Sequence, residues 1–574
     1  MIFKTLFAKV HKLPSLFFLI IIIGAGLRLY GTDFGLPDLL HLDEPFEINR
    51  ALRLATGSFD LSRAGKGGFY YIIFVEFVFM YLALYITGIT NSPIEFAYFF
   101  VNHEDMFYLM ARITSALIGT ISLYLIYRIG CKNGGKTVGL IAMFLLAIST
   151  LNITHAHFAT VDITLIFFLL LTWTYLFAIV EEGNKKDFYL AGLFGGLSLI
   201  TKFHAILIVV PMTLAYFLRL RRSTSSGKYH RYFAFSTILF FLVTFAGEPG
   251  YVKTFLNIDR TVESLYRTTD RNASENNTTQ ECLRESSNIN LYKFYTNIIT
   301  KDIGFPLLII FLISLIYFLF RRSAVEILVL SFSIPYFIAI CSTSTSLYFG
   351  RYVLPLIPLI ILVASRGLGK SIEYLHLSVK RLSYVQVNGI VLSIIVLLCF
   401  PNFLSGLAVS SQFREENTRI QAKKWIETTI SAGSTILMEG SPEHRSQRLV
   451  PLVNCKTNIR RMMNDLQNRD PGKKRYWELR SGYLDNCDIP RYDLILVQND
   501  QSWTEYEEFK LSDIEYVILD VKFLQNVCSK RTDPACLTRV AFYERLVIDP
   551  ELTKIAEFDS RVEIFKKNPP KKPD

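Results

Sequence analysis

The chain of 574 residues contains a succession of apolar runs that are each long enough to cross a bilayer. A helix that spans the hydrocarbon core needs about 17–25 mostly apolar residues. The runs lie near residues 13–30, 69–88, 106–128, 137–155, 162–180, 188–201, 203–219, 231–247, 303–320, 324–341, 347–365 and 387–408. Hydrophobic residues make up 51% of the chain, which excludes an ordinary soluble protein of this size. We therefore expect a multi-pass α-helical membrane protein.

The basic residues indicate which loops face the cytoplasm. The formal net charge is +11, which in a soluble protein would suggest nucleic acid as a partner. Here most clustered basic residues lie in short loops between apolar runs, as the positive-inside rule describes, so we expect no nucleic acid. The clusters are Arg128/Lys132/Lys136, Lys185/Lys186, Arg219/Arg221/Arg222/Lys228/Arg231, Arg321/Arg322 and Arg366/Lys370/Lys380/Arg381.

The N-terminal segment 1–12 is short and basic and precedes the first apolar run without a cleavage site, so we expect an uncleaved first helix with its N-terminus in the cytoplasm. The Arg128–Lys136 loop is then cytoplasmic only if one of the preceding runs does not cross. The weakest is 69–88, which carries Glu76 in its middle. We predict that it is a juxtamembrane helix at the outer face, within one external loop over 31–105, which leaves about 11 crossings.

The chain changes character after the last apolar run. Short apolar alternations such as Tyr492–Val497 and Tyr516–Leu519 stand in a charged sequence, as in strands of a soluble fold. We predict a transmembrane domain over 1–410 and a soluble α/β domain over 411–574 on the extracytoplasmic side.

One feature agrees with that orientation, and a second depends on it. The predicted external loop 248–302 contains glycosylation sequons at Asn272, Asn276 and Asn277. In the tail, Cys528 and Cys536 are close enough in sequence to form a disulfide in an oxidising compartment, and free buried thiols are the alternative.

Two groups of acidic residues fall on the predicted outer face. Asp43 and Glu44 follow the first apolar run and open an amphipathic helix, with His41 beside them. A carboxylate here is suited to deprotonate a hydroxyl or an amine, and helix capping is the alternative role. Asp162 begins a later run and follows His155 and His157. The two-residue spacing of these histidines favours a strand or a loop, and it is not the helical spacing of a zinc-binding pair.

Four cations lie in or beside apolar runs and need anionic partners. Lys202 separates two runs and is followed by His204, Arg351 lies at the outer end of a helix, Arg112 lies near the start of a run, and Lys66 lies in a glycine-flanked loop. For Lys202 and Arg351 one interpretation is that the side chains reach to the membrane interface. The functional interpretation is a pocket for a lipid phosphate, which arginine can bind through two hydrogen bonds.

Together these stretches resemble the GT-C type glycosyltransferases, the superfamily that holds the protein O-mannosyltransferases and the lipid A aminoarabinose transferase. The resemblance covers about the first 410 residues and rests on the order of its motifs. They are Asp43-Glu44, Leu109–Gly119, His157–Asp162, Gly195–Phe203 and Gly350–Pro358. The segments Ala422–Ile426 and Gly433–Leu437 are similar to the domain that often follows in this family.

The resemblance implies an enzyme that moves one sugar, with inversion, from a polyprenyl-phosphate carrier to a lipid, glycan or protein acceptor at the outer face of the bilayer. It implies that Asp43 acts as the base, with Glu44 and Asp162 as further catalytic carboxylates. The donor phosphate is expected at Lys202, Arg351, Lys66 and Arg112, and the substrates at His41, His155, His157 and His204. Many relatives have an aromatic-proline stretch where this chain has Gly65–Phe69, so the acceptor side differs.

Two alternatives stay open at this point. Within the enzyme class, the acceptor is a protein Ser/Thr hydroxyl. Outside it, the chain is a transporter or flippase, although no second copy of the Asp43-Glu44 region suggests the internal repeats of transporters. The sequence establishes no cofactor, and it leaves open whether a divalent ion joins Asp43 and Asp162.

Overall fold

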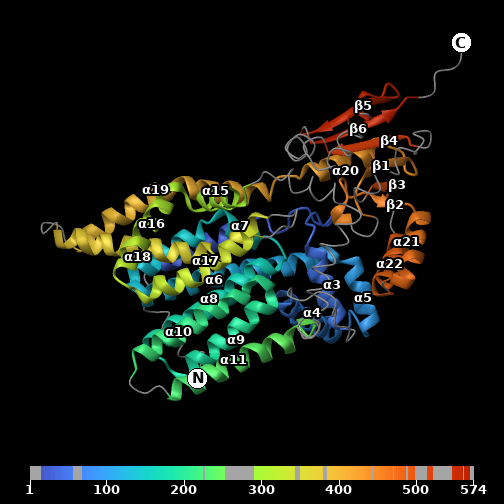
Figure 1. Cartoon of the computed structure of the whole chain (residues 1–574). Helices are drawn as coiled ribbons and strands as arrows, with labels where there is room; N and C mark the ends of the chain where they lie inside the picture. Colours follow the sequence, from blue (N-terminus) through green and yellow to red (C-terminus); the bar gives the residue numbers. More distant parts are fainter. Residues whose placement is uncertain are drawn as a thin grey trace, which may run out of the picture.

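The structure is a computed structural model. It describes residues 15–55, 67–223, 227–251, 290–342, 349–378, 384–441, 445–469, 471–485, 489–497, 514–520, 544, 546–559 and 561–568. A long helical bundle occupies one side of the molecule, and a smaller region that contains the sheet lies beyond one end of it (Figure 1).

Each predicted apolar run corresponds to helical structure. The first part of the bundle contains α2 (Ser15–Leu29), α3 (Glu44–Leu54), α4 (Gly68–Ile86), α5 (Pro93–Asn102), α6 (Glu104–Ala147), α7 (Thr150–Ala156), α8 (Val161–Glu181), α9 (Lys185–Thr201), η1 (Phe203–Ile208), α10 (Val209–Arg221) and α11 (Gly227–Gly247). The second part contains α15 (Leu291–Ile303), α16 (Phe305–Phe320), α17 (Ala324–Ser342), η2 (Gly350–Val353), α18 (Ile357–Ser378) and α19 (Tyr384–Gln412). The chain is a multi-pass membrane protein.

The number of crossings stays a prediction. Among the described residues, seven helices are long and apolar enough to cross a membrane, or eight if α15 and α16, bent by 105°, form one span. Helix α4 is one of the seven. Its predicted position at the outer face therefore stays a prediction as well. Helix α6 is broken at Gly135, where φ is +87°, and its two limbs meet where Gly130 faces Gly139.

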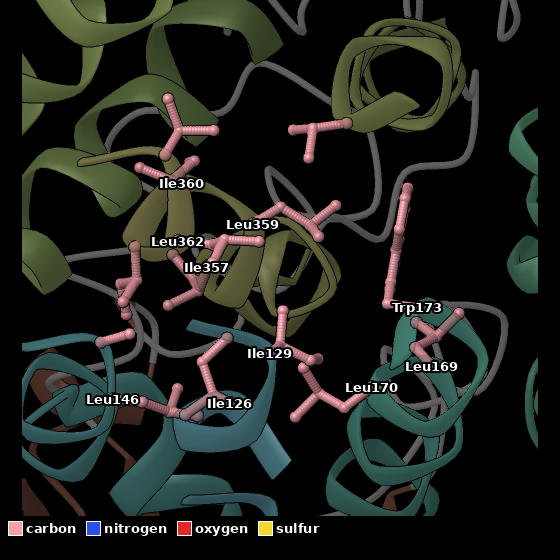
Figure 2. Packing of buried hydrophobic residues seen from close by; sticks show 14 of the residues in the cluster. Ile126, Ile129, Leu146, Leu169, Leu170, Trp173, Ile357, Leu359, Ile360 and Leu362 are labelled. Atoms are coloured by element: carbon pink, nitrogen blue, oxygen red, sulfur yellow. The ribbon is translucent and has the colours of Figure 1, made fainter. Parts of the chain in front are cut away.

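The core of the bundle lies where α6, α8 and α18 meet (Figure 2). Ile126 and Ile129 of α6 and Leu170 of α8 point toward Ile357 of α18, and Trp173 is buried beside them. Large apolar side chains on the outer helices stay exposed instead, such as Phe320 on α16, as expected for a surface that contacts lipid. Apolar side chains therefore face both the interior and the surroundings of the bundle.

The two ends of the bundle carry different charged residues. At one end, Lys132 lies 2.7 Å from Glu182, Arg219 donates to the carbonyl of Glu181, and Arg366 donates to the carbonyl of Asn133. Three of the predicted cytoplasmic clusters thus meet there. Helix α8 runs from Val161 to Glu181, so its Asp162 lies at the opposite end of the bundle.

Helix α7 is fixed at the break that follows α6. The Asp302 carboxylate accepts hydrogen bonds from the Ser149 hydroxyl at 2.8 Å and from the Leu151 amide at 2.7 Å. Arg28 donates to the carbonyl of Leu146 at the end of α6. Both helix ends thereby find partners for backbone groups that a helix leaves unsatisfied. The predicted strand or loop around His155 is wrong, because His155 lies in the last turn of α7.

The tail contains helices α20 (Thr418–Thr429), α21 (Lys456–Arg469) and α22 (Pro471–Asp485), η3 (Arg445–Gln447) and strands β1 (Thr435–Glu439), β2 (Val453–Asn454), β3 (Arg491–Val497), β4 (Tyr516–Asp520), β5 (Leu552–Phe558) and β6 (Val562–Lys567). The strand order is β2-β3-β1-β4-β6-β5, with β2, β3, β1 and β4 parallel and β6 antiparallel to β4 and β5. Both predicted strands are present, as β3 and β4, so the tail is an α/β fold.

Several sequence predictions fall outside the described residues. They are the sequons at Asn272, Asn276 and Asn277, the Cys528–Cys536 disulfide, and Lys66. The division at residue 410 and the extracytoplasmic position of the tail stay predictions.

Candidate active site

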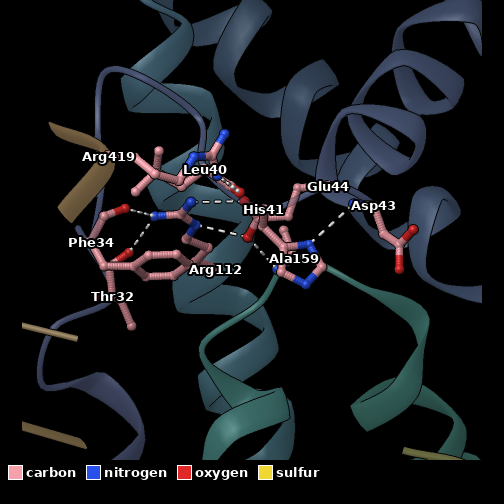
Figure 3. A network of polar contacts seen from close by, with 9 residues as sticks. All are labelled: Thr32, Phe34, Leu40, His41, Asp43, Glu44, Arg112, Ala159 and Arg419. Carbon is pink, nitrogen blue, oxygen red and sulfur yellow. Dashed lines mark hydrogen bonds and ion pairs between the residues drawn. The ribbon is translucent and has the colours of Figure 1, made fainter. Parts of the chain in front are cut away.

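A buried ion pair fixes the loop that carries the acidic dipeptide (Figure 3). Arg112 of α6 donates through Nε and Nη2 to the two carboxylate oxygens of Glu44, at 2.8 and 2.7 Å, and both side chains are 0% exposed. Its Nη1 donates to the carbonyls of Thr32 and Phe34. Glu44 also accepts the amide of Ala159 at 2.9 Å. One guanidinium therefore joins α6, the start of α3 and the loop between α2 and α3.

This geometry bears on two of the expected site residues. Glu44 is buried and bonded on both oxygens, which is the environment of a structural carboxylate, and its catalytic role stays a prediction. Arg112 is buried and directs its nitrogens at the loop, and its contact with a donor phosphate stays a prediction. The pair was hidden in the sequence, because the two residues are 68 positions apart.

Asp43 points away from this pair (Figure 3). It stands at the N-cap position of α3, but its side chain makes no capping hydrogen bond. Its Oδ2 instead accepts a hydrogen bond from Nη1 of Arg351 at 2.6 Å, and its side chain is 38% exposed. Of the two neighbouring acids, Asp43 is therefore the one that is accessible from outside the protein.

Asp162 lies on the far side of Arg351. Its Oδ2 is 3.9 Å from Nε of Arg351, and its Oδ1 accepts a hydrogen bond from Nζ of Lys202 at 2.6 Å. Asp43, Arg351, Asp162 and Lys202 thus form a row of alternating charges, which we call the charge row. The Arg351 guanidinium stands between the two carboxylates. The described residues contain no group of three or more His, Cys, Asp or Glu arranged to hold a metal.

Breaks in the helices position the two cations. Lys202 is the residue that ends α9, where the backbone is extended before η1 begins. Arg351 lies in η2, which precedes α18. A ring of Phe349 lies 4.4 Å from Cζ of Arg351, and the Tyr352 ring lies 5.0 Å from Nζ of Lys202. These aromatic faces stabilise the cations where water is partly excluded. Neither ring was predicted as part of the site, although Phe349 and Tyr352 lie within two residues of Arg351 in the sequence.

The four predicted substrate histidines have different surroundings. His155 places Nδ1 3.8 Å from Oδ2 of Asp162, and this nitrogen has no hydrogen-bond partner in the described part of the chain. His204 has a similarly unpartnered Nδ1, and its ring lies 5.5 Å from that of Tyr352. His155 therefore lies next to Asp162 of the charge row. His204 lies next to the Tyr352 ring, which faces Lys202.

His41 and His157 belong to the supporting structure. Nδ1 of His41 accepts the amide of Asp43 at 3.2 Å, and burial lowers the pKa of its imidazole. His157 is buried, with its two ring nitrogens 2.8 and 2.9 Å from the carbonyls of Ile153 and Tyr30. Both nitrogens of His157 are engaged by the backbone, and its contact with substrate stays a prediction.

The chain is similar to a known protein family and to several solved structures. Residues 105–246 match the family model described as dolichyl-phosphate-mannose-protein mannosyltransferase. This segment contains Asp162 and Lys202 but neither Asp43 nor Arg351. The match supports a GT-C type glycosyltransferase. The resemblance predicted from the sequence is thereby confirmed, with about a quarter of the chain covered by the family model.

The chain also matches solved structures, at TM-scores below 0.5. The Archaeoglobus fulgidus oligosaccharyltransferase tethered with an acceptor peptide is 12% identical, with a TM-score of 0.49, covering 93% of this chain and 72% of that one. ArnT from Cupriavidus metallidurans bound to undecaprenyl phosphate is 13% identical, with a TM-score of 0.46 and coverage of 96% and 97%. The Saccharomyces cerevisiae protein O-mannosyltransferase Pmt1-Pmt2 complex bound to the sugar donor is 17% identical, with a TM-score of 0.30 and coverage of 40% and 32%. No curated protein matches the sequence.

Loss of charge at the two members of the acidic dipeptide is expected to change the stability of the protein by very different amounts. Glu44→Gln leaves the buried Arg112 guanidinium without its counter-ion, so we expect the free energy of unfolding to fall by about 3–5 kcal/mol. Asp43→Asn, at a partly exposed ion pair, should change it by less than about 1 kcal/mol. Denaturant titration of the purified protein in detergent measures both, and equal losses would contradict the assignment.

The stability of the protein should fall in acid because of His155. Burial lowers the pKa of His155 to about 4, against an ordinary value of 6.5, although the Asp162 carboxylate opposes this shift. The unfolded chain therefore binds a proton at this residue more readily than the folded one. Stability present above pH 6.5 is lost as the pH falls toward 4, by at most about 3 kcal/mol. His155→Gln should remove this part of the loss in denaturant titrations, and His103→Gln, at an exposed position, should not.

Proposed function

We propose that this protein transfers one sugar from a polyprenyl-phosphate carrier to an acceptor hydroxyl or amine at the extracytoplasmic face of the membrane, with inversion at the anomeric carbon. The observation that carries the proposal is the charge row, in which a half-exposed carboxylate adjoins an arginine at the end of a membrane bundle. The family match over 105–246 supports the transferase class.

Arg351 and Lys202 are the proposed ligands of the donor phosphate. A phosphate offers acceptor oxygens that a guanidinium can bind in pairs, and lysine adds a compact charge. Both cations lie at breaks between membrane helices, where a phosphate at the interface would sit while its lipid tail stays in the bilayer. Cations at this place stabilise the negative charge that develops on the leaving phosphate.

Binding of the donor would also release the base. Arg351 holds the Asp43 carboxylate at 2.6 Å in this structure, so one oxygen of that carboxylate is engaged by the guanidinium. A phosphate that arrives at Arg351 competes with Asp43 for the same guanidinium. Asp162 keeps Lys202 and Arg351 together through the exchange, because it lies between them. The Asp43 carboxylate is thereby freed for the acceptor only when the donor is present.

The transfer step then balances as a direct displacement. The acceptor oxygen or nitrogen forms a bond to the anomeric carbon while the bond from that carbon to the phosphate oxygen breaks. The acceptor proton passes to the Asp43 carboxylate, and the polyprenyl phosphate leaves with the bonding electron pair. Holding donor and acceptor in line on opposite sides of the sugar supplies much of the rate enhancement.

A protein Ser/Thr hydroxyl is the second candidate acceptor. The matched family model is described as a protein mannosyltransferase, and this favours a mannosyl donor and a protein acceptor. The chain's own residues favour neither acceptor class, because the described part of the site contains the same base for each.

A turnover assay with a panel of radiolabelled polyprenyl-phosphate sugars and membrane extract as the acceptor source tests the proposal. Wild-type protein should release polyprenyl phosphate from one donor, and Asp43→Asn should lower the rate by about 100-fold or more, since general base catalysis contributes on that scale. Asp33→Asn is the matched control, because Asp33 is an exposed acid of the same loop, paired with Arg414.

Each arm has an outcome that contradicts the proposal. Release from no donor would argue against a glycosyltransferase, and transport of a lipid-linked substrate would then be the function to test. Release by Asp43→Asn at the rate of the Asp33→Asn control would remove Asp43 from the role of base.

A further inference from the structure

The tail reaches back to the loop that precedes Asp43. Lys423 of α20 places Nζ 2.6 Å from Oδ1 of Asp38, with the two side chains 15% and 7% exposed. Arg419, one helical turn earlier on the same face, donates through Nη1 to the carbonyl of Leu40 at 3.0 Å. Helix α20 therefore holds the loop at two points that are two residues apart.

The residue between those two points has an unusual backbone. Leu39 has φ of +54°, in the left-handed region that a residue with a side chain seldom adopts. Its side chain is buried in the same cluster as Ile48 and Ala51 of α3. The contacts on either side, at Asp38 and Leu40, oppose relaxation of this conformation. The loop is thus held in a shape that it would not adopt by itself.

A hydrogen bond continues the connection from this loop to Asp43. His41 follows Leu40 directly, and its Nδ1 accepts the amide of Asp43 at 3.2 Å. The other end of the connection is anchored in the tail, because Arg419 also donates to the carbonyls of Leu449 and Ser446 at 3.0 Å each. A rigid path therefore runs from the tail through residues 38–41 to the start of α3.

We infer that Lys423 and Arg419 are positioning residues that set the direction of the Asp43 carboxylate from the tail. Neither touches the reacting atoms, and both act through the loop. The consequence for turnover rests on the proposed function, whereas the consequence for the shape of the loop does not. The tail is then part of the active-site support and not only a surface for acceptors.

Hydrogen exchange tests the structural half of this inference without any substrate. Lys423→Met removes the ammonium and leaves the Asp38 carboxylate buried without it. Amides in a peptide covering residues 38–47 should then exchange about tenfold faster, which corresponds to about 1.4 kcal/mol of lost protection. Lys424→Met is the matched control on the same helix, because Lys424 is exposed and pairs with Glu416 within the tail. Equal exchange in the two variants would overturn the inference.

Turnover tests the functional half. Lys423→Met should lower kcat by about 10- to 100-fold, as expected for a misplaced base, and should not raise the KM for the donor, because Arg351 and Lys202 are intact. A double variant that carries both Lys423→Asp and Asp38→Lys swaps the two charges. It should restore both the hydrogen-exchange pattern and kcat, which a general loss of folding would not allow. Faster exchange with unchanged kcat would overturn the positioning role. If wild type transfers no sugar, the proposed function fails, and hydrogen exchange still decides whether the tail sets the loop.

Discussion

The architecture of the site depends on the buried ion pair between Arg112 and Glu44. Two unpaired charges in this interior would cost several kcal/mol each, so each residue can be tolerated only because the other is present. The pair ties the first loop to α6 and to Ala159, just before α8. Because Glu44 is turned inward and held there, its neighbour Asp43 is turned outward toward Arg351. One acid of the dipeptide is thus buried in the fold, and the other is partly exposed and faces Arg351.

The same logic extends across the charge row and into the tail. Asp162 satisfies Lys202 and approaches Arg351, so cations that would be costly among membrane helices have partners. Supports converge on this place from separate parts of the chain: Asp302 and Arg28 secure α7, and α20 secures the loop before Asp43. If the supporting segments moved, the distance between the proposed base and the donor phosphate would vary. Transfer chemistry requires that this distance stay fixed, and support from several sides keeps it so.

The sequence was sufficient where the physics is local. Apolar runs of membrane length became helices, two alternating segments became β3 and β4, and the need of embedded cations for partners led to Lys202 and Arg351, which the structure brings next to Asp162. It was insufficient where contacts join distant residues. Nothing local distinguishes Glu44 from Asp43, since only the approach of Arg112 does so. The spacing of His155 and His157 misled for the same reason, because Asp302 starts a short helix there from a distant segment.

The most direct test is a cryo-electron microscopy structure of the protein with a bound polyprenyl phosphate. The account predicts that the phosphate lies within hydrogen-bond distance of Arg351 and Lys202, that Asp43 has separated from Arg351, and that Glu44 still holds Arg112. A phosphate bound elsewhere, with the Asp43–Arg351 pair intact, would contradict it.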